Sequence, residues 1–330
     1  MKQNGGSSRR KVLYWTVAFS VAGILLYYSL RGVDWRQVGA TLSHADPIYV
    51  ACAVALSSFA LLCRAVRWRV LLKAGAEVSI PTAFWATCAG YFGNSFLPAR
   101  AGELVRTFII SARTKLTKTF VLTTALSERL SDAVTLVIIS SIVLLTLPVL
   151  PGWFAQAAKP FAIVGLCGAA CIAILPRTER FWLKVLARVP IPQSIRARIA
   201  GILEEILVGL RAFHHSGRLA RFAGLAAVIW FCDAAGTVIL MRALGFSISL
   251  PIAFLLITGF GLGSALPATP GYVGIYQFVA VSVLVPFGFA KADAIAFSFL
   301  VQALQYLFIG FWGLLALSRQ RGLKLKSIAE

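Results

Sequence analysis

Charged side chains interrupt two apolar parts of the sequence, in spacings that suggest chemistry. The run "ARAGELVR" at 99–106 contains Arg100, Glu103 and Arg106. Glu103 and Arg106 are one helical turn apart, so a helix brings them close enough to pair. Because ionisable groups within a membrane are costly, they mark a functional site by default. These residues are therefore candidates for binding a charged substrate.

A second charged run, "LSERLSD" at 126–132, contains Glu128, Arg129 and Asp132. On a helix, Glu128 and Asp132 share one face while Arg129 points elsewhere. Asp233 stands close to the middle of another apolar stretch. We interpret these four residues as an ion-pair network that can carry protons. The alternative is a set of buried pairs that only fix helix packing.

A short breaker occurs twice, as "SFLPARAG" at 95–102 and "SALPATPG" at 264–271, 169 residues apart. After each break we expect a helix to restart, from Gly102 and from Gly271. The free N–H groups and positive dipole end of such a helix bind anions. Arg100 and Arg106 add full positive charge beside the first, which suits a phosphate. The candidate substrate-binding residues are Asn94, Arg100, Gly102, Glu103, Arg106, Pro270, Gly271, Gly274 and Gln277.

The composition identifies the class of protein that must position these residues. Of 330 residues, 59% are hydrophobic and 13% charged, and the mean hydropathy is +0.82. These values predict an all-α integral membrane protein, a single membrane domain over 1–330. The net charge of +20 does not indicate nucleic-acid binding, because the positive residues gather in short segments between apolar runs, as cytoplasmic loops do.

Apolar runs of about 20 residues predict about six full spans. We place them at 12–30, 47–66, 120–147, 161–175, 222–244 and 292–317. The Lys and Arg residues that flank the spans predict that both chain ends lie in the cytoplasm, together with a basic, amphipathic loop at 177–221. The protein is therefore expected in a bacterial inner membrane.

Two remaining regions, 81–112 and 250–285, are broken at their centres by the repeated motif. The flanking charges predict that the first enters from the cytoplasm and the second from outside, as in an inverted repeat. Each is a re-entrant hairpin or a pair of short spans. We expect Pro98 and Pro267 to meet around a cavity at mid-depth, since unpaired backbone cannot face lipid. Ordinary Pro and Gly kinks are the alternative.

The remaining chemistry-bearing residues predict neither a metal nor a cofactor. The cysteines have no CxxC spacing, and the three histidines lie in loops. There is no P-loop motif. The energy for any transport must therefore come from an ion gradient, a partner protein or the concentration difference of the lipid across the membrane. The run "RAVRWRVLL" looks like a positive flank, in which Arg64 and Arg67 contact the lipid surface beside Trp68.

At these motifs the sequence resembles the transmembrane region of lysylphosphatidylglycerol synthases, also called the flippase-like family. The resemblance rests on "RAVRWRVLL", "NSFLPARAGELVR", "SERLSDAV" and "LPATPGYVGIYQ", in that order. In two-part members the membrane region is assigned to moving a lipid that a cytosolic transferase makes. The family often has Gly-Gly and a Glu in the last motif, where this chain has Tyr272 and Gln277.

Residues and resemblance together predict a lipid translocase for an anionic phospholipid or polyprenyl-phosphate-linked lipid, and not an enzyme. A lipid-synthesis enzyme is an expected partner. One alternative is a membrane-embedded transferase that modifies a lipid or lipid-linked sugar. Another is a scaffold for lipid synthesis.

The predicted topology is tested by labelling single cysteines in a variant without native cysteines. Because the Lys and Arg excess places the 177–221 loop inside, a cysteine at Ser194 should react with a membrane-impermeant reagent only after the membrane is opened. Labelling of Ser194→Cys in intact cells would overturn the layout.

Overall fold

The computed structural model describes residues 5–97, 101–147, 153–174, 216–264 and 272–319, together with positions 193, 196 and 201. Over these residues helix is the regular secondary structure, which confirms the all-α fold. The helices are α1 (Gly5–Leu30), α2 (Trp35–Ser43), α3 (Pro47–Leu72), α4 (Ile80–Phe96), α5 (Gly102–Arg113), α6 (Lys118–Thr146), α7 (Trp153–Ile174), α10 (Ser216–Ala243), α11 (Leu250–Gly263), α12 (Ile275–Leu284), the 3-10 helix η5 (Val285–Phe287) and α13 (Lys291–Ser318).

Four of the described helices, α3, α6, α10 and α13, are long and apolar enough to cross a membrane. They correspond to four of the predicted spans. The predicted spans at 12–30 and 161–175 fall on α1 and α7, so the number of spans stays a prediction. The predicted cytoplasmic loop at 177–221 lies almost entirely outside the described residues.

Residues with short polar side chains cap the N-termini of several of these helices. The side chain of Asp46 accepts a hydrogen bond from Ile48 N at 2.8 Å, with Pro47 at the first helical position of α3. Ser79 and Thr117 similarly cap α4 and α6. Because a capping side chain satisfies an N–H group that has no partner within the helix, these residues fix where each helix starts.

Each broken region consists of two short helices, as the motif predicts. The first comprises α4 and α5, and the second comprises α11, α12 and η5. The breaks themselves, at 98–100 and 265–271, lie outside the described residues, as does the predicted meeting of Pro98 and Pro267. Whether the pairs are re-entrant therefore stays a prediction.

Helix α5 starts at Gly102, as predicted, but α12 starts at Ile275 and not at Gly271. The backbone explains the difference, because Tyr272 and Gly274 have φ values of 59° and 88°. Such angles do not fit a right-handed helix. A Cβ on Gly274 would also lie 2.5 Å from the carbonyl oxygen of Ala22 in α1. Gly274 therefore permits a close backbone contact instead of extending α12.

Glycines also bring α4 and α5 together as a helical hairpin. A Cβ on Gly102 would lie 1.8 Å from the carbonyl oxygen of Gly90, and one on Gly93 would lie 2.7 Å from Gly102 Cα. The two backbones are in direct contact there. Small residues at such a crossing allow helices in membranes to approach closely. This approach places the first turn of α5 against the last turns of α4.

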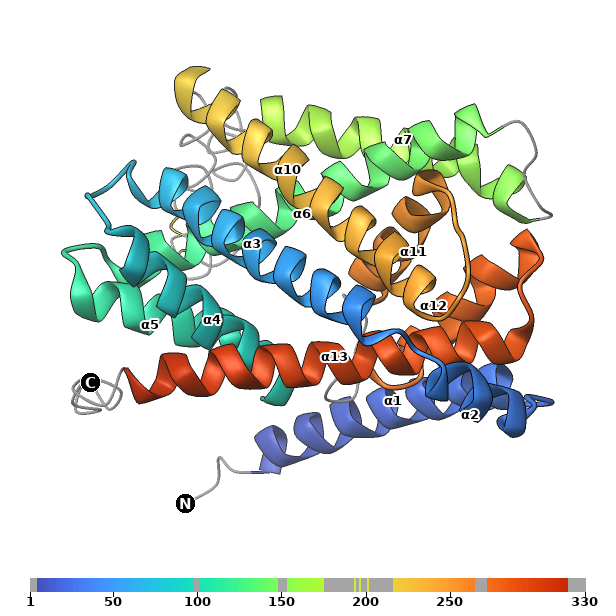
Figure 1. Cartoon of the computed structure of the whole chain (residues 1–330). Coiled ribbons are helices and arrows are strands. Elements are labelled where there is room, and N and C mark those ends of the chain that lie inside the picture. The colour runs from blue at the N-terminus through green and yellow to red at the C-terminus, as the bar shows by residue number, and fades with distance from the viewer. Residues whose placement is uncertain are drawn as a thin grey trace.

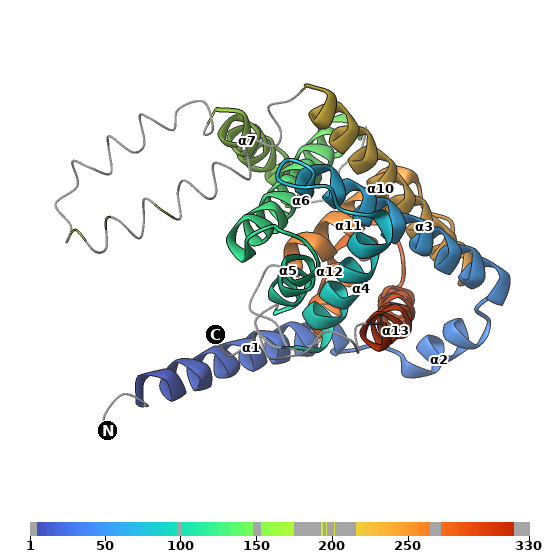
Figure 2. The ribbon, with the colours of Figure 1, turned by 90° about the vertical axis from the view of Figure 1, so that its left-hand side faces the viewer.

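The two hairpins lie toward opposite ends of the molecule. In Figure 1, α4 and α5 lie toward the end where α13 finishes, whereas α11 and α12 lie toward the end where α13 begins. Arg113 at the end of α5 donates to the carbonyl of Arg319 just after α13, at 3.5 Å. Figure 2 turns this end toward the viewer, with α3, α6 and α13 around the first hairpin.

Helices α3 and α10 run side by side in opposite directions (Figure 1). Their pairing is closed at one end by a hydrogen bond of 2.8 Å from Asp46 N to the carbonyl of Ala243. At the same end of the molecule, the Lys291 ammonium donates to the carbonyls of Tyr28 and Arg31. A cation at the last carbonyls of a helix stabilises that terminus, so Lys291 joins α13 to α1.

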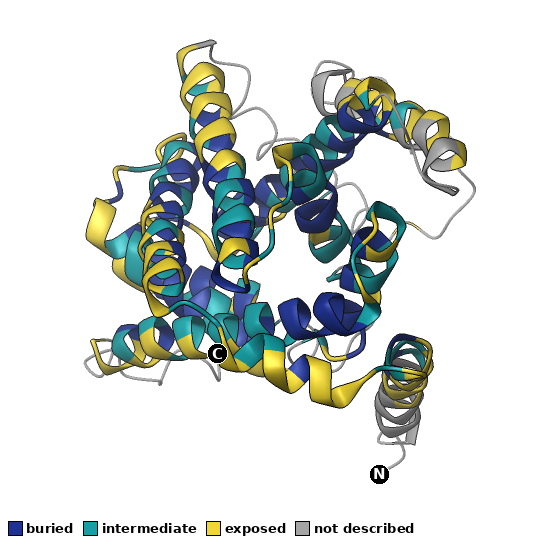
Figure 3. Ribbon diagram, turned by 45° about the vertical axis from the view of Figure 1, so that its right-hand side comes forward, coloured by how far each residue is buried: buried dark blue, intermediate teal, exposed yellow. Residues whose placement is uncertain are grey.

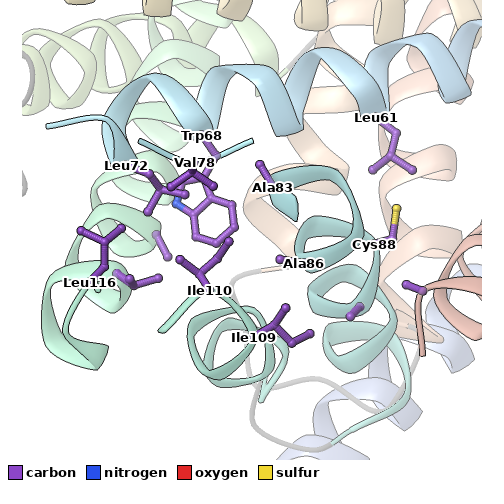
Figure 4. Packing of buried hydrophobic residues seen from close by; sticks show 14 residues of the cluster. Leu61, Trp68, Leu72, Val78, Ala83, Ala86, Cys88, Ile109, Ile110 and Leu116 are labelled. Atoms are coloured by element: carbon purple, nitrogen blue, oxygen red, sulfur yellow. The ribbon is translucent and has the colours of Figure 1, made fainter. Parts of the chain in front are cut away.

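Two large apolar clusters and two smaller ones form the core of the described chain. One large cluster, around Trp68, lies between α3, α4, α5 and α6 (Figure 4). The other large cluster, around Phe297, lies between α6, α10, α11, α12 and α13. Figure 3 shows buried residues where helices face one another and exposed residues on the outward faces. In a membrane protein those outward apolar faces contact lipid.

We predict that Gly102→Ala destabilises the protein. The new methyl group would overlap the carbonyl oxygen of Gly90 in α4, so the hairpin must separate, at a cost of about 2 kcal/mol or more in the free energy of unfolding. Thermal unfolding in detergent micelles measures the loss. Gly224→Ala in α10 is the matched control, because no atom lies within 4 Å of the added Cβ. Equal unfolding temperatures for the two variants would contradict the direct backbone contact.

Candidate functional site

Six charged side chains from α3, α5 and α6 form a continuous network of ion pairs inside the described chain. An arginine and an aspartate pair beside it, between α3 and α10. The network is built from Arg67, Arg106, Arg129, Glu103, Glu128 and Asp132, and the adjoining pair is Arg64 with Asp233.

Glu128 on α6 lies at the centre of the network. One of its oxygens accepts from Arg67 at 3.0 Å, and the other accepts from Arg106 at 2.9 Å. Arg67 also holds both oxygens of Asp132, at 2.6 and 2.8 Å. The side chains of Arg67 and Arg106 are only 1% and 3% exposed. Bidentate contacts of this kind combine charge with fixed geometry.

Aromatic rings cover the two buried guanidinium groups. Arg106 lies over the ring of Trp68 at 4.4 Å, and Arg67 lies over the ring of Phe222 at 4.9 Å. The indole N–H of Trp68 donates to the hydroxyl of Thr124 at 3.2 Å, which fixes the ring. A ring face attracts a cation most strongly where water is excluded. Trp68 therefore joins the ionic network to the apolar core beneath it (Figure 4).

Glu103, in the first turn of α5, collects three donors. Arg106 pairs with it as the spacing predicts, Arg129 Nε donates to it at 2.9 Å, and the Asn94 amide donates at 3.2 Å. Arg129 lies over the ring of Tyr91 at 5.1 Å and remains 34% exposed. The close approach of α4 and α5 thus brings Asn94 and Tyr91 to the same carboxylate network.

Arg64 and Asp233 form a hydrogen-bonded ion pair between α3 and α10. Their side chains are 18% and 22% exposed. The Arg64 guanidinium lies 6.0 Å from the ring centre of Trp230, which also belongs to α10. Arg64 and Arg67 are one turn apart on α3, so the pair adjoins the larger network.

The arrangement balances charge in a part of the fold where a lone charge is costly. The eight side chains contribute four positive and four negative groups. Losing one partner of a buried pair is more damaging than losing both, because the remaining charge stays uncompensated. Among the described residues, no group of His, Cys, Asp or Glu is arranged to hold a metal ion.

The structure corrects the placement of Arg64 and Arg67, which the sequence placed at the lipid surface. Arg67 is 1% exposed and Arg64 pairs with Asp233. The physical reason is that carboxylates on α6 and α10 face this side of α3. Arg129, expected to point away from its neighbours on α6, reaches back to Glu103.

The predicted residues of the second hairpin lie apart from the ionic network. Gln277 is fully buried, accepts from Gly274 N at 2.8 Å and donates to Gln302 at 2.8 Å. It caps α12, as a Glu or Gln at the third position of a helix does. Pro270, Gly271 and Arg100 lie outside the described residues.

Several residues around the charges were missed by the sequence analysis. Tyr91, Trp230 and Phe222 lie against arginines. Away from the charges, the sequence analysis also missed Tyr276, which donates to Gln305 on α13, and Gln302, which accepts from the predicted residue Gln277. Only Trp68, between two arginines in "RWR", carried a local signal. The others are common apolar or polar residues of membrane helices, whose partners come from distant segments.

The fold and the site define a multi-pass helical membrane protein with a buried ion-pair network. The chain belongs to the lysylphosphatidylglycerol synthase TM region family, whose model matches residues 15–313. This confirms the resemblance found in the sequence. No solved structure matches the chain.

A curated relative gives a further indication. The chain is 26% identical over 317 residues to a protein of Haloferax volcanii named glycosyltransferase AglD. The match covers 84% of this chain and 50% of the relative, so the chain spans about half the length of that protein. This relative contradicts the prediction that the chain is not an enzyme, because the name of the relative denotes a group-transfer enzyme.

We predict that Arg67→Met lowers the free energy of unfolding by about 3 kcal/mol or more, because Glu128 and Asp132 lose their shared cation in a buried site. Adding Asp132→Asn should recover part of the loss by removing one uncompensated charge. Denaturation in detergent measures both. Lys115→Met, at an exposed position, is the control for loss of positive charge. If Arg67→Met and Lys115→Met unfold alike, the network does not stabilise the fold.

Proposed function

We propose that the chain binds the anionic headgroup of a membrane lipid for a group-transfer reaction on that lipid or on a lipid-linked sugar. The observation that carries the proposal is the buried charge network between apolar helices. The names of the family and of the curated relative, a lipid synthase and a glycosyltransferase, support group transfer. Since the chain spans about half of that relative, the activity of the whole relative is not assumed for it.

The network is suited to phosphate chemistry. When a group is transferred from a lipid phosphate, the bond from the group to a phosphate oxygen breaks, and negative charge collects on the phosphate. Arginines that are already oriented by carboxylates stabilise such charge without rearranging. A carboxylate that lies near the acceptor hydroxyl can take its proton. Arg129 and Arg64, the most exposed arginines of the site, are the groups that a headgroup reaches first.

Translocation of the lipid is a second candidate, favoured by the helix order. Helices α3 to α6 and α10 to α13 both run long, short, short, long. The two short pairs lie toward opposite ends of the molecule (Figure 1). The second helices of the two sets, α4 and α11, begin with similar segments, "SIPTAF" at 79–84 and "SLPIAF" at 249–254. Ser79 and Ser249 stand at the N-caps, and a proline follows in each first turn.

These correspondences support an inverted repeat, the architecture in which two halves alternate access to a central site. Within this proposal the protein lies in a bacterial inner membrane, and both chain ends face the cytoplasm. A lipid-synthesis enzyme is the partner that would supply or consume the lipid. The substrate is an anionic phospholipid or a polyprenyl-phosphate-linked lipid.

The test compares lipid composition with lipid sidedness in cells lacking the protein. Group transfer predicts that an unmodified lipid or lipid-linked sugar accumulates, which mass spectrometry of extracted lipids detects. Arg106→Gln should reproduce the accumulation, because Arg106 holds both Glu103 and Glu128. An immunoblot must show that the Arg106→Gln protein is present in the membrane in the same amount as the unaltered protein.

An unchanged composition with altered sidedness, measured by impermeant labelling of headgroups, would favour translocation over transfer. If neither composition nor sidedness changes in the deletion strain, both candidate functions are wrong. Lys115→Gln, which removes an exposed positive charge outside the network, should behave as the unaltered protein does.

A further inference from the structure

The arginines of the site are of two kinds. Arg67 and Arg106 are almost fully buried, and each is held by two carboxylates. Arg64 and Arg129 are 18% and 34% exposed, and the described chain gives each of them one carboxylate. A guanidinium group carries five N–H donors. Arg64 and Arg129 therefore keep donor capacity at partly exposed positions. Arg67 and Arg106 direct most of their donors to carboxylates, and the Nε of Arg67, which has no hydrogen-bond partner among the described residues, is buried.

Trp230 supplies a second donor beside Arg64. Its indole Nε1 is buried and has no hydrogen-bond partner among the described residues. The same ring lies 6.0 Å from the Arg64 guanidinium. A buried donor without an acceptor costs about 1–3 kcal/mol, so each such group calls for an explanation, and a bound ligand is one. An anion that extends from Arg64 to the Nε1 edge of this ring would supply the acceptor that this indole lacks.

The Arg64–Asp233 pair occupies a special position in the fold. The two residues are 169 positions apart, the same separation as the repeated breakers. Each lies in the middle part of a long helix, α3 or α10, and these helices hold corresponding places in the two sets of four. The pair thus joins corresponding positions of the two halves. A ligand at this pair contacts both halves at once.

We propose that Arg64 and the Trp230 indole N–H form a subsite for the phosphate of a lipid headgroup, with Asp233 competing for Arg64. The proposal rests on the proposed function and names the contacts of its substrate. Asp233 orients the guanidinium in the absence of lipid. Once a phosphate shares the same guanidinium, the two anions repel, so Asp233 limits the affinity.

Binding of short-chain lipids to the purified full chain in detergent tests the subsite. The probes are farnesyl phosphate, dihexanoyl phosphatidylglycerol and dihexanoyl phosphatidylcholine, titrated by isothermal calorimetry. The first two distinguish a prenyl phosphate from a glycerophospholipid as the source of the anion. Phosphatidylcholine, which has no net charge, reports binding by the chains and the choline headgroup alone.

Three substitutions give a pattern that a purely structural pair would not. Arg64→Gln should weaken binding of the preferred anionic lipid about tenfold or more, because a charge-assisted contact is lost. Trp230→Phe keeps the ring and removes only the N–H, and should weaken binding about threefold to tenfold. Asp233→Asn keeps an acceptor for Arg64 and removes the competing charge, so binding should tighten about threefold or more.

Matched controls separate local effects from net charge. Arg36→Gln removes an exposed arginine of α2, and Asp46→Asn changes the net charge as Asp233→Asn does while keeping a good helix cap. Both should bind as the unaltered chain does. If Arg64→Gln fails to fold, the conservative substitutions at Trp230 and Asp233 still decide the question.

The outcomes distinguish this inference from the function on which it rests. If the unaltered chain binds neither anionic lipid more tightly than phosphatidylcholine, headgroup binding itself fails. If it binds an anionic lipid but Trp230→Phe and Asp233→Asn leave the affinity unchanged, the headgroup lies elsewhere and only the subsite is wrong. Weaker binding by Asp233→Asn would show that Asp233 supports the ligand instead of competing with it, which also overturns the proposal.

Discussion

Pairing of charges in an apolar interior is the constraint on which the rest of this structure depends. Glu128 is only 4% exposed, where a lone carboxylate is costly, and Arg67 and Arg106 reach it from two other helices. The three helices must therefore hold one relative position. An apolar contact tolerates sliding between helices, whereas a bidentate ion pair does not. The network thus specifies which faces of α3, α5 and α6 meet.

The glycines of the first hairpin make that pairing geometrically available. Contact between the backbones at Gly90 and Gly102 allows α5 to lie close enough for Asn94 of α4 to share Glu103 with Arg106 and Arg129. Close packing and charge pairing therefore depend on each other. A side chain at the crossing would separate the two helices and leave the carboxylate with fewer donors.

The helices of the second broken region, α11 and α12, pack with neutral groups where the first has charges. Where α5 and α6 are joined by ion pairs, α12 and α13 are joined by hydrogen bonds from Gln277 to Gln302 and from Tyr276 to Gln305. The negative charge that α10 contributes, Asp233, reaches across to Arg64 on α3. The described charges of the site consequently lie on α3, α5, α6 and α10.

The sequence by itself determined the long helices and the two broken regions, because their causes are local. Apolar length predicts the four long helices, Pro and Gly predict the two breaks, and one-turn spacing predicts the Glu103–Arg106 pair. It could not predict that Arg67 is buried, since a positive residue after an apolar run usually faces the headgroups. Only the tertiary structure decided that, because the carboxylates that compensate Arg67 are 61 and 65 positions away. The partner of Arg64 likewise depends on how α3 and α10 lie against each other, which no local pattern encodes.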